Sequence, residues 1–197
     1  MPRYKEFDPK DCLDKVMYLF WQKGYQNTSM SDLVEHSGVQ RYGLYETFGG
    51  KEVLFQRALD LYLSTVIHQR LAMLERKQPE PSVAEIEQFF EQFIEHVDRP
   101  YSFFGCLMCN TAVEVALHDK IVASMVQQYF DRLRQGFARS LTRAKQNGEI
   151  ADSTDIGQIS ELLVGSVLGL TTYARSSAPR QDVRTYINGI LAMLKLL

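Results

Sequence analysis

Residues 28 to 51 carry hydroxyl, basic and aromatic side chains whose chemistry suits contact with a phosphate-bearing polymer. Hydroxyl groups and the N–H groups at a helix N-terminus donate hydrogen bonds to phosphate oxygens. Arg41 could bind a guanine through two hydrogen bonds, and the ring of Tyr42 could contact the methyl group of a thymine. Lys51 adds a positive charge where a further helix is expected to begin. Together these groups would allow contact with both the backbone and the bases of DNA.

Two short helices would have to position these side chains. Ser29, with Asp32 three residues later, is a variant of the capping box and predicts a helix start, and Gly38 predicts the end of that helix. A second helix is predicted over residues 40–48, where a pair of glycines ends it. Two helices joined by a tight, glycine-containing turn form a helix-turn-helix, whose second helix can enter a major groove.

The predicted second helix has one apolar and one polar face. Leu44 and Phe48 lie about one turn apart, so we expect them to face the core. At about 100° per residue, Tyr42 and Glu46 then point away from the core. Gly43 lies at the flank, where it would allow close approach to a duplex.

The spacing of apolar residues predicts helices along the whole chain, and we find no strand pattern and no internal repeat. About nine helices are expected, over approximately residues 9–24, 29–38, 40–48, from 51 onward, 83–97, 105–118, 119–146, 155–175 and 180–196. The predicted fold class is all-α. A three-helix helix-turn-helix domain is expected over residues 1–52, and a helical effector-binding and dimerisation domain over residues 53–197.

The last two predicted helices are apolar around more of their circumference than one buried face requires. Such a surplus points to a partner surface, and two helices from each of two copies could form a four-helix bundle about a two-fold axis. The alternative is burial within one chain. The predicted interface residues are Leu162, Gly165, Val167, Gly169, Tyr186, Ile187, Ile190 and Leu194.

Two of the three cysteines, Cys106 and Cys109, are close enough in sequence to share a helix face. A buried free cysteine often acts only as a small apolar residue. The alternative is that one of them senses oxidants or electrophiles, because a helix N-terminus can lower a thiol pKa. Phe89, Phe93 and Phe103 belong to an aromatic group that is expected in the core and could line a pocket for a partly apolar small molecule.

Composition narrows the possible classes of protein. The net charge is −2, and residues 1–56 carry seven Lys or Arg against eight Asp or Glu, so nucleic-acid binding would depend on local charge. The cysteines form no disulfide framework, so a reducing cytoplasmic location is expected. The apolar runs are too short to span a bilayer, so no membrane contact is expected. We find no catalytic pair, phosphate-cradling loop, cofactor motif or metal-ligand spacing, so neither an enzyme nor a cofactor or metal site is expected.

The ordered pattern of the N-terminal residues resembles the DNA-binding domain of the TetR family of bacterial repressors. The resemblance runs through Phe20, Gly24-Tyr25, the Thr28-Ser29 cap and Lys51-Glu52-Val53-Leu54-Phe55. In addition, the segment that begins Gly105-Cys106-Leu107 is weakly similar to repressors of electrophile-detoxifying reductases. The resemblance implies phosphate contacts by Thr28 or Ser29, Tyr45, Thr47 and Lys51, and base contacts by Gln40, Arg41, Tyr42 and Gly43. Tyr42 and Gly43 depart from the family pattern, which often has a small residue and a Ser or Thr there.

The resemblance therefore implies a homodimeric repressor. It would bind a palindromic double-stranded DNA operator and leave it when an unidentified small-molecule effector binds or a thiol is modified. One alternative is a helical DNA-binding protein without an effector, acting as a structural or cell-cycle factor. Two further alternatives are an all-helical enzyme and a protein-interaction module that uses only the terminal helices.

Overall fold

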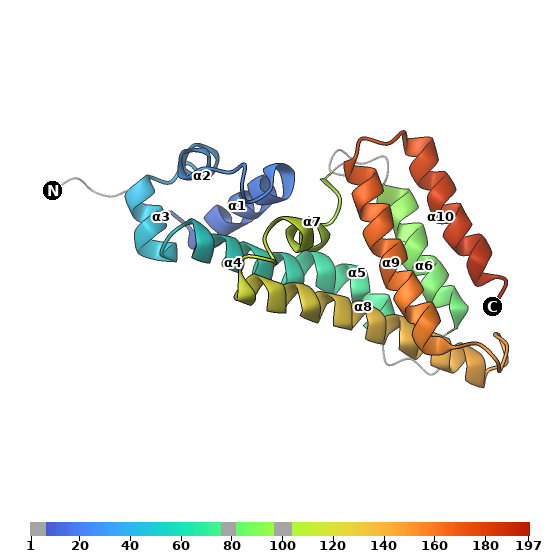
Figure 1. Cartoon of the computed structure of the whole chain (residues 1–197). Helices are drawn as coiled ribbons and strands as arrows, with labels where there is room; N and C mark the ends of the chain where they lie inside the picture. The colour runs from blue at the N-terminus through green and yellow to red at the C-terminus, as the bar shows by residue number, and fades with distance from the viewer. Residues whose placement is uncertain (1–6, 76–81, 97–103) are drawn as a thin grey trace.

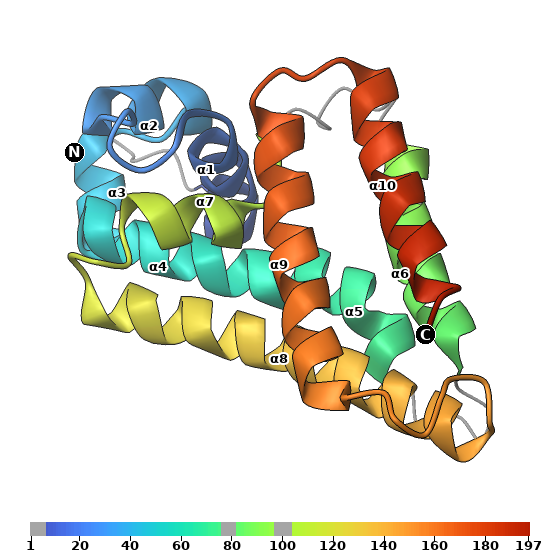
Figure 2. The same cartoon turned by 45° about the vertical axis from the view of Figure 1, so that its right-hand side comes forward.

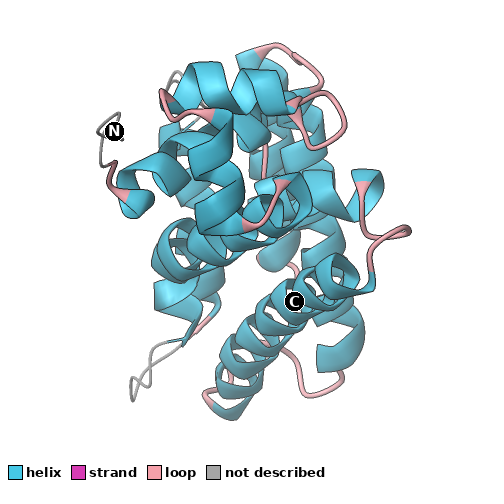
Figure 3. Ribbon diagram, turned by 90° about the vertical axis from the view of Figure 1, so that its left-hand side faces the viewer, coloured by secondary structure: helices cyan, strands magenta, loops and turns pink. Residues whose placement is uncertain are grey.

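The computed structural model describes residues 7–75, 82–96 and 104–197. Within these ranges the secondary structure is entirely helical (Figure 3). The helices are α1 (Pro9–Lys23), α2 (Met30–Ser37), α3 (Arg41–Phe48), α4 (Lys51–Tyr62), the π-helical turn η1 (Leu63–Ile67), α5 (His68–Glu75), α6 (Val83–His96), α7 (Leu107–Glu114), α8 (Lys120–Gln146), α9 (Ile156–Arg175) and α10 (Arg180–Leu194). Because α4, η1 and α5 follow one another without a break, the described ranges contain nine helices, which confirms the all-α prediction.

Local signals in the sequence set the ends of the first helix. The Asp8 carboxylate caps α1 by accepting a hydrogen bond from the N–H of Lys10. Pro9 occupies the first turn, where a backbone N–H has no partner within the helix, so proline breaks no helical hydrogen bond there. Gly24 ends α1 with a φ of 83°, a conformation that favours glycine. The ring of Phe20, on the buried face of α1, meets the ring of Phe55 on α4 with centroids 4.9 Å apart.

Helices α4 to α5 and α8 run side by side along the molecule and connect its two ends (Figure 1). Gly136 of α8 allows this close packing, because a Cβ there would lie 3.1 Å from the Cβ of Leu74 on α5. Since α4 starts at Lys51, the predicted domain boundary between residues 52 and 53 falls within its first turn.

Helices α6, α9 and α10 form a second group of helices, which stands across the end of α8 (Figure 2). The core between α6 and α8 consists of aromatic rings. Phe89 and Phe90 are fully buried and lie 5.3 and 6.0 Å, centroid to centroid, from the ring of Phe137. The expectation of a largely aromatic core is therefore correct here.

The structure corrects one predicted helix boundary. The helix expected over residues 105–118 is only α7, which ends at Glu114. The Asp119 side chain accepts hydrogen bonds from the N–H groups of Ile121 and Val122 and so starts α8 in a new direction. A four-residue turn, residues 115–118, therefore separates α7 from the cap of α8 at Asp119, and the apolar pattern of the sequence did not reveal it.

The structure also corrects part of the predicted partner surface. Val167, Ile187 and Leu194 are buried within the chain itself, and Ile190 is 7% exposed. These side chains face α6, α8 or the neighbouring terminal helix, because α9 packs against α8 and α10 packs against α6 and α9. Leu162 and Gly165 are exposed on α9. Tyr186 is 37% exposed, but its hydroxyl lies 2.6 Å from the position that a Cβ of Gly169 would occupy, so Gly169 makes room for a side chain of its own chain.

Candidate nucleic-acid interface and buried thiol cluster

Helix α3 is held by one face and presents the other to solvent. Leu44 and Phe48 are 1% and 3% exposed, whereas Tyr42 and Tyr45 are 58% and 45% exposed. Arg41 is also exposed, with its guanidinium carbon 6.0 Å from the centroid of the Tyr45 ring. The division between a buried and an exposed face predicted for residues 40–48 is therefore correct.

The N-terminal ends of α3 and α4 are both suited to anions. Neither Gln40 nor Gly50, which precede these helices, supplies a side-chain cap, so the first N–H groups keep their capacity to donate. Lys51 is half-buried, with its Nζ 4.1 Å from the ring centroid of Tyr25. Burial lowers the pKa of Lys51, and the nearby carboxylates of Glu114 and Asp32 oppose that effect. Thr47 is half-buried and Glu46 is exposed.

The capping box predicted at Ser29 is confirmed. The N–H of Asp32 donates to Ser29 Oγ at 3.1 Å, and the N–H of Ser29 donates to Asp32 Oδ2 at 2.7 Å. Lys23 Nζ donates to the other carboxylate oxygen at 2.6 Å. The hydrogen bond from Lys23 is the largest cause that holds the pKa of Asp32 far below its ordinary value, and the hydrogen bonds from Ser29 act in the same direction.

Two of the predicted DNA contacts need correction. Thr28 is fully buried and its hydroxyl donates to the carbonyl oxygen of Gly24 at 2.6 Å, so the hydroxyl stabilises the turn after α1 and does not face a phosphate. At Gly43 a Cβ would lie 3.2 Å from Val39 and 3.3 Å from Phe7. This side of α3 is therefore covered by the protein, and the missing side chain makes room for Phe7, not for a duplex.

Cys106, Tyr62 and Tyr129 form a buried polar cluster where α7 begins. Cys106 is the residue before α7 and is 0% exposed. The Tyr62 hydroxyl donates to Cys106 Sγ at 3.7 Å and accepts a hydrogen bond from the N–H of Leu107 at 3.3 Å. Cys106 Sγ also lies 3.7 Å from the hydroxyl of Tyr129 on α8. The thiol is thus hydrogen-bonded on two sides inside the protein.

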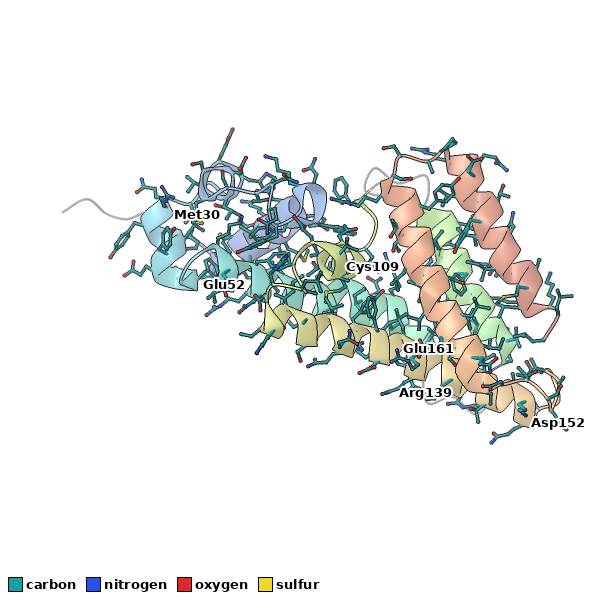
Figure 4. All side chains as sticks on the ribbon, viewed as in Figure 1. Met30, Glu52, Cys109, Arg139, Asp152 and Glu161 are labelled. Atoms are coloured by element: carbon teal, nitrogen blue, oxygen red, sulfur yellow. The ribbon has the colours of Figure 1, made fainter. Side chains whose placement is uncertain are left out.

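The environment separates the pKa values of the two neighbouring thiols. Burial raises the pKa of Cys106, but hydrogen bonding with Cys109 and the positive charge of Arg70 together lower it to about 5. The hydrogen bond with Cys106, followed by burial, holds the pKa of Cys109 well above its ordinary value. Both residues are free cysteines, and Cys109 lies on α7, between the N-terminal helices and α9 (Figure 4). The thiolate form is therefore favoured at Cys106 and disfavoured at Cys109.

The aromatic residues predicted to line a pocket do not all lie at this cluster. Phe89 lies in the ring core of α6 and α8, whereas Phe93 is half-buried, with the guanidinium carbon of Arg70 4.9 Å from its ring centroid. Phe103 lies outside the described residues. In the part of the chain that the structure describes, no group of three or more His, Cys, Asp or Glu side chains could hold a metal ion.

Sequence reasoning missed the three side chains that surround Cys106. Tyr62, Arg70 and Tyr129 belong to α4, α5 and α8, and they lie 23 to 44 residues from Cys106 in sequence. Only the packing of these helices brings them together, and no local spacing marks them.

Comparison with known families agrees with this geometry. Residues 13–58 match the family described as bacterial regulatory proteins, tetR family, and residues 82–190 match a tetracyclin repressor-like C-terminal domain. The chain belongs to the TetR family and is a DNA-binding transcriptional regulator.

Curated relatives cover almost the whole chain. An uncharacterized HTH-type transcriptional regulator, YezE of Bacillus subtilis (strain 168), is 32% identical over 196 residues, which are 98% of this chain and 100% of the relative. The HTH-type transcriptional repressor ComR of Escherichia coli (strain K12) is 30% identical over 89% of this chain and 83% of its own length.

Solved structures share the fold. A cysteine mutant of the TetR family regulator CifR, complexed with 26-base-pair double-strand operator DNA, has a TM-score of 0.82 at 24% identity and covers 96% of this chain and 98% of its own. The reduced form of E. coli NemR has a TM-score of 0.79 at 19% identity, with 95% of both chains covered. Among the described residues, no helix is both long and apolar enough to cross a membrane.

The ion pair of Asp32 with Lys23 predicts a pH-dependent contribution to stability. Because the folded-state pKa of Asp32 is lowered, the contribution is present above the unfolded value of about 3.9 and is lost as the pH falls below it. Urea unfolding at a series of pH values should show wild type more stable than Asp32→Asn near neutral pH, with a difference that shrinks below about pH 4.

The matched control is Lys23→Met, alone and combined with Asp32→Asn. The two substitutions should be less than additive near neutral pH, because each removes the same ion pair. A difference between wild type and Asp32→Asn that stays constant down to about pH 2 would contradict the assignment.

Proposed function

We propose that the protein is a homodimeric repressor that binds a palindromic operator through α3 and releases it when Cys106 is modified by an electrophile. The observation that carries the DNA-binding part is the exposure of Arg41, Tyr42 and Tyr45 on a helix whose other face is buried. This role places the protein in the cytoplasm beside the chromosome and requires no catalytic step. A small-molecule effector that causes release by binding without a covalent bond is the alternative form of the same proposal.

In this proposal the DNA-contacting residues of α2, α3 and α4 divide into two groups. Gln40, Arg41 and Tyr42 lie at its N-terminal end, where recognition helices contact base edges. Tyr45 and Lys51, with Ser29 and Thr47, lie where backbone phosphates would pass. The Ser29 hydroxyl serves the capping box in the free protein, so its contribution would come chiefly from the N-terminus of α2.

The dimer would use the exposed side of α9 and α10. Leu162 is 49% exposed, and Tyr173 and Tyr186 are each 37% exposed. Gly165 is exposed, and no atom lies within 4 Å of the position its Cβ would occupy, so a partner helix could approach closely. Two such pairs of helices would form a four-helix bundle about a two-fold axis. The proposal requires this axis to run so that both copies of α3 face the same side.

Release would begin with addition of the Cys106 thiolate to a carbon–carbon double bond that is conjugated to a carbonyl group of the electrophile. The sulfur forms a bond to the alkene carbon farther from the carbonyl, the π electrons move to the carbonyl oxygen, and the resulting enolate takes a proton from water. The added group cannot fit beside the buried hydroxyls of Tyr62 and Tyr129 without moving α7. Movement of α7 is therefore the proposed signal.

The recognition surface can be tested with an operator selected from random DNA. Arg41→Ala should weaken binding by about 1–3 kcal/mol and relax the base preference at one position in each half-site. Lys51→Ala should weaken binding to all sequences and reduce the slope of log affinity against log salt concentration by about one. Lys195→Ala, an exposed charge at the far end of the chain, is the control. Unchanged affinity in both test variants would contradict the role of α3.

The partner surface can be tested with Gly165→Arg. The substituted side chain has room in the single chain, but it would bring a charge into the proposed interface. Light scattering after size exclusion should report a dimer for wild type and a monomer for the variant. Gln127→Arg, on the exposed side of α8, should stay dimeric. A dimer of Gly165→Arg would exclude this face.

The thiol mechanism can be tested with N-ethylmaleimide. Modification should abolish operator binding by wild type and by Cys12→Ser, whereas Cys106→Ser should bind DNA before and after treatment. Because the pKa of Cys106 is lowered to about 5, its modification rate should change little between about pH 6.5 and 8.5, unlike that of an ordinary thiol. Undiminished DNA binding by protein whose Cys106 is shown by mass spectrometry to be alkylated would refute the mechanism.

A further inference from the structure

Polar contacts connect the C-terminal end of α1 with the C-terminal helices. They are additional to the covalent connection through α4, which joins the same two parts of the chain. The first comes from the indole of Trp21, whose Nε1–H donates to the carbonyl oxygen of Gly105 at 3.1 Å. Trp21 is 7% exposed, and its ring packs on the rings of Tyr62 and Phe104 at 5.1 and 5.9 Å. The residue thus connects α1 directly with the segment that precedes Cys106.

The second contact comes from Arg175, the last residue of α9. Its Nη1 donates to the carbonyl oxygens of Trp21 at 3.1 Å and Phe104 at 2.9 Å, and its Nη2 donates to that of Gln22 at 3.4 Å. Trp21 and Gln22 belong to the last turn of α1, where carbonyl groups have no partner within the helix. A guanidinium suits this position because it carries a positive charge and several donors in one plane.

The third contact comes from Glu114, the last residue of α7. Its two carboxylate oxygens accept hydrogen bonds from the N–H groups of Tyr25 at 3.1 Å and Gln26 at 2.7 Å. Gly24 makes this approach possible, because a Cβ there would lie 2.8 Å from one of the carboxylate oxygens. The carboxylate thereby fixes the turn that connects α1 with α2.

These contacts place α7 between the thiol cluster and the DNA-binding domain (Figures 1 and 2). Cys106 immediately precedes α7 and Glu114 ends it, so one short rigid helix separates the two. Gly105 also packs tightly against α9, since a Cβ there would lie 2.7 Å from the carbonyl oxygen of Thr171. A displacement at Cys106 would therefore act on Trp21 through Gly105 and on the turn after α1 through Glu114.

We propose that Glu114 and Arg175 are positioning residues that fix the orientation of the DNA-binding domain relative to the C-terminal helices. The inference rests on the proposed dimeric, operator-binding function. A palindromic operator requires two copies of α3 at a fixed separation, so free rotation of each domain would weaken binding to the whole operator more than binding to one half-site. Neither residue is expected to contact DNA.

The test compares the full-length wild-type protein with Glu114→Ala and Arg175→Gln on three DNA probes. The probes are the selected operator, a single half-site, and operators whose half-site spacing is changed by one base pair in either direction. Both variants should lose about tenfold in affinity for the operator, as expected when hydrogen bonds to a charged group are removed, and should keep wild-type affinity for the half-site. Their preference for the natural spacing should also be weaker.

Matched controls remove the same charges elsewhere. Glu91→Gln on α6 and Arg139→Gln on α8 are both exposed and should behave as wild type on all three probes. Arg139 is matched to Arg175 because its Nη2 also donates to a main-chain carbonyl oxygen, that of Leu74 at 3.2 Å. If Glu114→Ala does not fold, Glu114→Gln retains the length of the side chain but can accept through one oxygen only, so it should show the same effect to a smaller extent. Equal losses on half-site and operator, or no loss on either, would overturn the proposal.

Trp21 provides a second measurement that needs no DNA. It is the only tryptophan of the chain. Arg175 donates hydrogen bonds to the carbonyl oxygen of Trp21 itself and to that of Phe104, whose ring packs on the indole. Its fluorescence emission should shift to longer wavelength in Arg175→Gln, as the indole gains solvent, and should stay unchanged in Arg139→Gln. An unshifted emission in Arg175→Gln would contradict the positioning role. If the emission shifts but no operator can be selected from random DNA, the positioning role stands and the proposed function is refuted.

Discussion

An eight-residue helix is not stable by itself in water, so α3 exists only because the protein buries one of its faces. Leu44 and Phe48 supply that face, and the core around Phe20 and Phe55 receives it. The same requirement orients the exposed side chains, since a helix anchored through Leu44 must turn Tyr42 outward and leave Tyr45 at its flank. The exposure of the face of α3 that is proposed to read DNA is thus a direct consequence of hydrophobic burial in the N-terminal domain.

A different constraint acts at the centre of the molecule. A thiol and two phenol hydroxyls are buried together at Cys106, and buried polar groups are tolerated only when they have hydrogen-bonding partners. Tyr62 meets this requirement by bonding both to Cys106 and to the first N–H of α7. The chemistry of the thiol and the position of α7 therefore depend on each other, which makes this cluster a suitable origin for a conformational signal.

The family assignment and the geometry support each other without being equivalent. The matched family regions cover the helix-turn-helix and most of the C-terminal helices, and they establish a DNA-binding regulator. They do not specify how the two parts communicate in this chain. The polar contacts of Glu114 and Arg175 with the end of α1 are particular side-chain arrangements, and they give the C-terminal helices a hold on the DNA-binding domain in addition to α4.

Apart from the turn between α7 and α8, the sequence by itself determined the helices, the Ser29 capping box and the two faces of α3. Caps and helical periodicity act between residues three or four positions apart, so they are visible in the sequence. Only the tertiary structure decided which sides of α9 and α10 face inward. Helices that are apolar around most of their circumference have no single inner face in the sequence, so Val167 and Leu162 could not be distinguished. Folding likewise turned Thr28 inward and brought Arg70, Tyr62 and Tyr129 to Cys106, since contacts between distant residues depend on helix packing and leave no local pattern.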